Sequence, residues 1–103
     1  MIGADDALRS ILSSVWSSLP QDSADIRKLL QAGDVHRANR LLHAIKGYAP
    51  LFCADALTAE VVQIEALSRT ATPAEVAPVF EALDVRLQQL LAEIQAFLNT
   101  PAA

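Results

Sequence analysis

Apolar residues recur every three or four positions along most of this chain, and that spacing constrains its fold more than any other feature of the sequence. It is the repeat of a helix that buries one face and exposes the other. Runs of β-branched residues, which strands favour, do not exceed the pair Val61-Val62. We therefore predict an all-α fold. The clearest apolar stripe consists of Val35, Ala38, Leu41, Leu42, Ile45, Tyr48, Ala49 and Phe52.

Capping and turn residues divide the apolar pattern into helices joined by short connections. Gly33 is expected to follow the end of one helix, and Asp34 to cap the next. Residues 72–75, Thr-Pro-Ala-Glu, make a capping box that starts the last helix. Short connections make neighbouring helices antiparallel. The expected architecture is therefore an up-down antiparallel four-helix bundle with a short or kinked N-terminal helix.

Two prolines complicate the predicted helices. Pro20 interrupts the first apolar stripe, which nevertheless continues through Ile26 and Leu30. Because proline lacks a backbone N–H, we expect either a kink at this point or two helices stacked nearly end to end, and we favour two helices. Pro78 lies within the first two turns of the last helix, where it is expected to kink the helix or to delay its start.

Length and charge limit the classes of protein to which the chain can belong. Its 103 residues are enough for one domain, residues 1–103, with one core. The net charge of −4 argues against nucleic-acid binding. A single cysteine, Cys53, excludes an internal disulfide and a cysteine-based metal cage. No apolar run approaches the roughly 20 residues of a membrane span, so we expect a cytoplasmic protein without direct membrane insertion.

The face opposite the stripe of residues 35–52 is polar, and it is exposed if the stripe is buried. It places His43 in mid-helix, with a cation one turn away on each side and Gly47 one turn after it. A glycine inside a helix costs about 1 kcal/mol relative to alanine, which indicates a need for close approach at that spot. The residues on this face are His36, Asn39, Arg40, His43, Lys46 and Gly47.

Residues 43–57 resemble the signature of the histidine-phosphotransfer (HPt) domain family. That signature starts with the histidine and continues with an aliphatic residue, a Lys-Gly pair, and small and apolar residues at fixed spacing. The pairs Leu19-Pro20 and Gly33-Asp34 lie at distances before the histidine that many HPt sequences show, and Glu65 fits an acidic residue that often closes the following helix. The residues that match the signature itself are His43, Ile45, Lys46, Gly47, Ala49, Phe52, Ala54 and Leu57.

The resemblance implies a phosphorelay, in which the chain carries a phosphoryl group between the aspartates of two receiver domains. Nε2 of His43 would accept the group, Lys46 would offset its charge, and Gly47 would let the receiver approach. Mg²⁺ is expected on the receiver, so this chain would hold no cofactor and no metal, as a phosphocarrier rather than a stand-alone enzyme. We expect a monomer, either free-standing or attached to a sensor histidine kinase. The residues expected to contact the receiver are His36, Asn39, Arg40 and Pro50.

Two departures from the family pattern leave another function open. Cys53 stands where the family usually has glycine, and it is strained if that position is left-handed. Pro50 removes a backbone donor seven residues after the histidine. The alternative is an HPt-fold docking module that regulates a partner protein by binding, with little or no phosphotransfer. No nucleophile–base arrangement indicates an independent enzyme. A metal site at His36 and His43 is disfavoured, because the two are seven residues apart and lack a third ligand.

Overall fold

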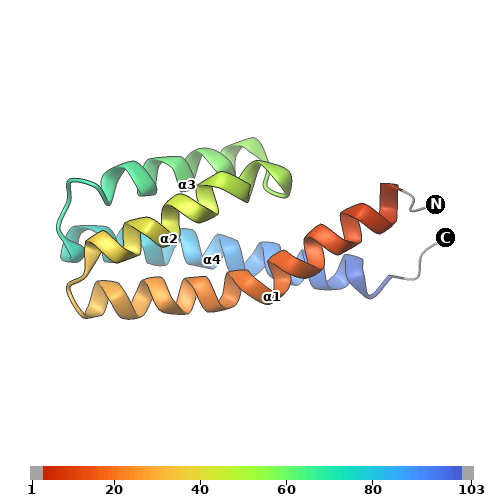
Figure 1. The fold of residues 1–103 in the computed structure, drawn as a ribbon, viewed down its shortest axis with the longest axis horizontal. Helices are drawn as coiled ribbons and strands as arrows, with labels where there is room; N and C mark the ends of the chain where they lie inside the picture. Colours follow the sequence, from red (N-terminus) through yellow and green to blue (C-terminus); the bar gives the residue numbers. More distant parts are fainter. Residues whose placement is uncertain (1–3, 101–103) are drawn as a thin grey trace.

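The fold is a bundle of four α-helices, seen in a computed structural model that describes residues 4–100. Successive helices run up and down, and each packs on the next along the chain, while the last returns to pack on the first (Figure 1). No strand is present within residues 4–100, so the predicted all-α antiparallel bundle is confirmed. The elements are α1 (Ala4–Gln31), α2 (Val35–Tyr48), the 3₁₀ helix η1 (Ala49–Leu51), α3 (Asp55–Leu67) and α4 (Pro73–Leu98).

α1 is one helix of 28 residues that continues through Pro20. The prediction of two stacked helices is therefore wrong. Pro20 lies on the exposed side, where the carbonyl of Trp16, which loses its usual donor, can be hydrated instead. On the other side, Leu19 and Ile26 are fully buried, and their packing holds the two halves together. Figure 1 shows the N-terminal part of α1 inclined to the rest, as expected for a helix bent at an internal proline.

The turn from α1 to α2 has the geometry that the sequence predicts. Gly33 adopts a φ of 81°, which is left-handed. Its N–H donates to the carbonyl of Leu30, and the N–H of Asp34 donates to the carbonyl of Leu29 at 2.8 Å. These two bonds satisfy the last carbonyl groups of α1. The Asp34 carboxylate then accepts a bond from the N–H of Arg37, which caps α2 and fixes where that helix begins.

The start of α4 also follows its capping signal. The Thr72 hydroxyl accepts a bond from the Glu75 N–H, and the Glu75 carboxylate accepts one from the Thr72 N–H. Pro73 occupies the first helical position, where a missing N–H removes no helical bond. Pro78 neither delays the start of the helix nor ends it, since α4 runs without a break from Pro73 to Leu98.

α2 ends without the backbone strain at Cys53 that a left-handed conformation there would have caused. The α-helix stops at Tyr48 and tightens into η1, which contains Pro50. The N–H of Cys53 donates to the carbonyl of Ala49 at 2.8 Å, so the turn closes on an ordinary bond. Within residues 4–100 only glycine has a positive φ, so the condition under which Cys53 would be strained is not met. The thiol is half-buried against the core, and burial raises its pKa to about 11.

The core runs along the axis of the bundle and is almost entirely aliphatic. Phe80 of α4 is its largest fully buried side chain, and it lies among leucines, isoleucines and valines from all four helices. The molecule measures 48 × 20 × 18 Å, and the outer ends of α1 and α4 extend beyond α2 and α3 at one end (Figure 1). No helix within residues 4–100 is long and apolar enough to cross a membrane.

Candidate functional site

The candidate site lies on the outer face of α2, at the seam with α3. Ala38, Leu42 and Ile45 are buried and fix the orientation of α2 on the bundle. The same orientation turns His43 outward, with 67% of its side chain exposed. The other residues that the sequence placed on this face and that are exposed are His36, Arg40 and Gly47, and Pro50 is exposed in η1.

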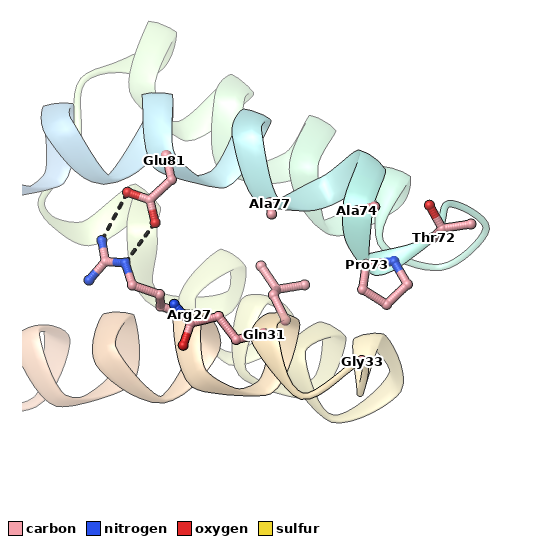
Figure 2. A pocket seen from close by; sticks show the side chains of 9 residues that line it. Arg27, Gln31, Gly33, Thr72, Pro73, Ala74, Ala77 and Glu81 are labelled. Atoms are coloured by element: carbon pink, nitrogen blue, oxygen red, sulfur yellow. Dashed lines mark hydrogen bonds and ion pairs between the residues drawn. The ribbon is translucent and has the colours of Figure 1, made fainter.

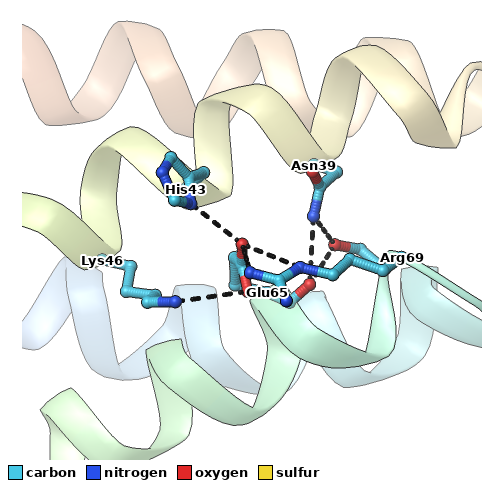
Figure 3. A network of polar contacts seen from close by, with 6 residues as sticks. Asn39, His43, Lys46, Glu65 and Arg69 are labelled. Atoms are coloured by element: carbon cyan, nitrogen blue, oxygen red, sulfur yellow. Dashed lines mark hydrogen bonds and ion pairs between the residues drawn. The ribbon is translucent and has the colours of Figure 1, made fainter.

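His43 rests on a carboxylate from the neighbouring helix. Its Nδ1 atom lies 3.0 Å from Oε1 of Glu65, in the last turn of α3 (Figure 3). Only 1% of the Glu65 side chain is exposed. The cover over this carboxylate comes from side chains that are themselves partly exposed, His43, Lys46 and Arg69, so Glu65 lies just beneath the surface rather than in the deep core.

Two cations keep this carboxylate ionised. Arg69, just after α3, donates to Oε1 of Glu65 from Nη2 at 2.7 Å and from Nε at 3.2 Å. Nζ of Lys46 lies 3.7 Å from Oε2. Burial alone raises the pKa of Glu65, but the bonds from Arg69 and His43 and the charges of Arg69 and Lys46 outweigh it, so that the pKa falls below its ordinary value. Glu65 is therefore a carboxylate at neutral pH.

The ionised Glu65 determines which nitrogen of His43 is free. A carboxylate only accepts hydrogen bonds, so Nδ1 of the neutral imidazole must carry the proton and donate it. Nε2 then holds the lone pair. Within residues 4–100, no hydrogen bond engages Nε2. The geometry thus leaves the exposed imidazole with an unprotonated and unoccupied Nε2, which is the state that a nucleophile requires.

Asn39 fastens α2 to α3 rather than projecting into solvent. Its amide nitrogen donates to the carbonyl of Glu65 at 3.0 Å and to Oγ of Ser68 at 2.8 Å. Asn39 is half-buried, which corrects the expectation that it is an exposed member of the polar face; Lys46, on that same face, is also only partly exposed. These two bonds fix the register of the two helices, and so the position of Glu65 beneath His43.

Replacing Asn39 with alanine is expected to lower the free energy of unfolding by about 1–2 kcal/mol, because two inter-helix hydrogen bonds are lost. Urea denaturation followed by circular dichroism measures the change. His36→Ala on the same helix is the control, since His36 is exposed and its loss should change stability by less than about 0.5 kcal/mol. Equal effects of the two substitutions would show that Asn39 does not hold the helices in register.

Comparison with protein-family models found a match to the Hpt domain over residues 10–97, which contain His43 and the three residues whose charges meet there, Lys46, Glu65 and Arg69. The chain belongs to the Hpt domain family. Comparisons with curated proteins and with solved structures found no match. Hpt domains are the phosphotransfer domains of two-component phosphorelays and interact with receiver domains, and in those general terms this is the role of the chain.

Two residues of the site in this Hpt domain were not singled out as site residues from the sequence. Glu65 was noted only as a family-like acidic residue, although its position four residues after Val61 and eight after Leu57 places a charge on the buried side of α3. A charge on a buried face is a recognisable signal, because it requires a partner. Arg69, four residues after Glu65, completes an (i, i+4) ion pair that the same spacing indicates.

A hollow elsewhere on this Hpt domain differs in character from the His43 site. It lies between the end of α1 and the start of α4, with a volume of about 400 Å³, and Figure 2 shows the pair of Arg27 and Glu81 spanning it. Arg27 also bonds Asp84, so its guanidinium is occupied by two carboxylates. The hollow contains no histidine or cysteine, and its charged groups tie α1 to α4 rather than offering a reactive atom.

Proposed function

We propose that this Hpt domain accepts a phosphoryl group on Nε2 of His43 from the phosphoaspartate of one receiver domain and gives it to the aspartate of another. The observation that supports this most directly is the pairing of His43 with the ionised Glu65. It combines an exposed imidazole with a fixed tautomer, the two properties that an acceptor histidine requires.

The transfer exchanges one bond for another. The lone pair of Nε2 attacks phosphorus in line with the acyl-phosphate oxygen, the N–P bond forms as the P–O bond breaks, and the receiver carboxylate leaves. The proton on Nδ1 stays in place. Because the imidazole ring then carries positive charge, the Glu65 carboxylate at 3.0 Å stabilises the phosphorylated ring as well as orienting the free one. Transfer to the second receiver reverses the same step.

The charge of α2 suits an acidic partner. Although the chain has a net charge of −4, α2 contains both histidines and three basic residues, and it has no acidic residue. Arg40 and Lys46 lie one turn before and one turn after His43, where they can offset the charge of the incoming phosphoryl group. A receiver with an acidic pocket and bound Mg²⁺ complements this surface. We expect this chain itself to bind no cofactor or metal and to act as a cytoplasmic monomer, free or attached to a kinase.

Gly47 lets the receiver approach close to His43. A methyl group added at Gly47 would meet nothing within 4 Å in the described part of the chain, so packing within the domain does not require glycine. We therefore assign the need for a small residue to the partner. Together with His36, Arg40 and Pro50, and with the partly exposed Asn39, Gly47 forms the proposed docking surface.

Gly47→Ala is expected to raise the free energy of unfolding by about 0.5–1 kcal/mol, because alanine favours a helix and fits without contact. Gly47→Gln is expected to slow phosphotransfer from a receiver by about tenfold or more, because its side chain occupies the docking surface next to His43. Thermal unfolding and the transfer rate measure the two effects. If Gly47→Gln transfers at the wild-type rate, the receiver does not approach at this point.

The test of the proposed function is transfer from a panel of phosphorylated receiver domains, with Mg²⁺, to the full chain. Phosphate that is labile in acid and stable in base would appear on this chain and then pass to a second receiver. The panel must be broad, because a mismatched receiver gives no transfer. Receiver binding without transfer by any member would overturn the proposal and favour the docking module.

A further inference from the structure

Oε1 of Glu65 is shared between two donors. His43 approaches it at 3.0 Å from α2, and the Arg69 guanidinium approaches it at 2.7 and 3.2 Å from the turn after α3 (Figure 3). Oε2, in contrast, is buried and has no hydrogen bond within the described residues, since Lys46 stays 3.7 Å away. The side-chain bonds that orient this carboxylate therefore all converge on one oxygen, and Arg69 supplies two of the three.

We propose that Arg69 is a positioning residue of the phosphotransfer site: its guanidinium holds Oε1 of Glu65 against Nδ1 of His43 and thereby keeps Nε2 as the free nucleophile. This inference rests on the proposed function. It assigns a role to a residue that touches neither the phosphoryl group nor, in the described structure, the imidazole. Arg69 acts through Glu65 alone.

The planar fork of arginine explains why this residue suits the position. The N–H groups on Nε and Nη2 of Arg69 point the same way and both donate to Oε1 of Glu65, which limits rotation of the carboxylate. The Glu65 side chain is buried, so without a strong donor its charge would be costly to keep. Arg69 itself is half exposed, with 53% of its side chain accessible, and therefore pays little desolvation for this contact.

The charged groups around Glu65 leave Arg69 as its main stabilising partner. From α2 it faces His43 and Lys46, and from the segment after α3 it faces Arg69. The basic residue of α4 that reaches α3, Arg86, pairs with Glu60 instead. Removing Arg69 is thus expected to raise the pKa of Glu65, because burial is then opposed only by His43 and the more distant Lys46.

The test compares Arg69→Gln with Arg69→Lys, which keeps the charge. As the matched control, Arg37→Gln removes an arginine from α2 that is 70% exposed and lies 4.0 Å from its acidic neighbour. ¹⁵N NMR of the imidazole reports the tautomer of His43 in the unphosphorylated protein, and the pH profile of phosphotransfer reports the pH below which protonation of the site stops transfer. We expect Arg69→Gln to reduce the fraction of the Nδ1–H tautomer and to move the acid limb of the transfer profile to higher pH. Arg69→Lys should restore both in part, and Arg37→Gln should change neither.

The outcomes separate this inference from the function on which it rests. The role of Arg69 would be overturned if Arg69→Gln kept the wild-type tautomer and the wild-type acid limb of the transfer profile. It would also be overturned if the acid limb shifted as much in Arg37→Gln. Either outcome would leave phosphotransfer itself intact. If wild-type protein accepts no phosphate from any receiver, the proposed function fails. The NMR comparison still decides in that case whether Arg69 fixes the imidazole through Glu65. Circular dichroism of each variant confirms that the bundle has folded.

Discussion

His43→Gln is expected to abolish the acid-labile phosphate that the chain acquires from a phosphorylated receiver, while the bundle stays folded. Glutamine has no nucleophilic nitrogen, since its amide lone pair is delocalised, so no N–P bond can form. The imidazole contributes little to the core, because 67% of the side chain is exposed and its internal contact is the hydrogen bond to Glu65. We therefore expect the free energy of unfolding to change by less than about 1 kcal/mol.

The control for this substitution is His36→Gln, which changes the other histidine of the chain, two turns away on the same helix. It should leave phosphate acceptance on His43 measurable, with at most a weaker affinity for the receiver. Label on the His43 variant at the wild-type level would move the acceptor to another residue. Loss of label accompanied by loss of the helical circular dichroism signal would instead report unfolding, which the exposure of His43 argues against.

Glu65→Gln is expected to slow phosphotransfer by about 10- to 100-fold, by analogy with the effect of removing a hydrogen-bond partner that orients a metal-binding histidine. The amide keeps the size of the side chain but loses the charge that stabilises the phosphorylated ring. It can also present its NH₂ group to Nδ1, which favours the wrong tautomer. Single-turnover transfer measures the rate, and receiver binding, measured separately, should remain close to that of the wild type.

The same substitution is expected to change how stability depends on pH. The folded-state pKa of Glu65 lies below its ordinary value of 4.5, so the unfolded chain binds a proton at this position before the folded one does. The contribution of Glu65 to stability is therefore complete above about pH 5 and is lost as the pH falls through the folded-state pKa. Glu65→Gln removes this contribution, about 1–3 kcal/mol at pH 7, and should flatten the acid side of the profile.

Urea denaturation at pH 7 and at about pH 3 tests this difference. Wild type should lose more stability between the two values than Glu65→Gln does. Asp55→Asn is a suitable control, because Asp55 is an exposed carboxylate in the first turn of the same helix. Parallel profiles for wild type and Glu65→Gln would mean that Glu65 is not held as a carboxylate in the folded protein, and the tautomer argument for His43 would fall with it.

Much of the fold could be predicted from local patterns. The apolar repeat set the helices, and Gly33, Asp34 and the Thr72–Glu75 box set where they end and begin, because each of these signals acts within a few residues. The course of α1 through Pro20 could not be predicted in the same way. Whether a helix survives a proline depends on how firmly the flanking turns are packed, and Leu19 and Ile26 are packed by other helices.

The candidate site also has one part that local sequence patterns predict and another that depends on packing between helices. The place of His43 on an exposed helical face followed from periodicity within one segment. The resemblance of residues 43–57 to a family signature predicted the chemistry of His43. That Glu65 lies beneath it depends on the register of α2 against α3, which Asn39 and Ser68 set across the seam. Spacing along one helix contains no information about that register. The sequence left open how α2 ends near Cys53, and the structure ends it in a 3₁₀ turn that needs no left-handed residue there.

The first turn of α1 and the last turn of α4 lie side by side at the same end of a 48 Å rod, beyond α2 and α3 (Figure 1). A linker joined to either terminus would therefore hold the domain by one tip. The domain could pivot about that tip, so that His43 would occupy many positions at a distance from the attachment point. Under such a tether, the local concentration of His43 at a receiver is set by linker length and stiffness, so linker composition could tune relay speed without any change at the site.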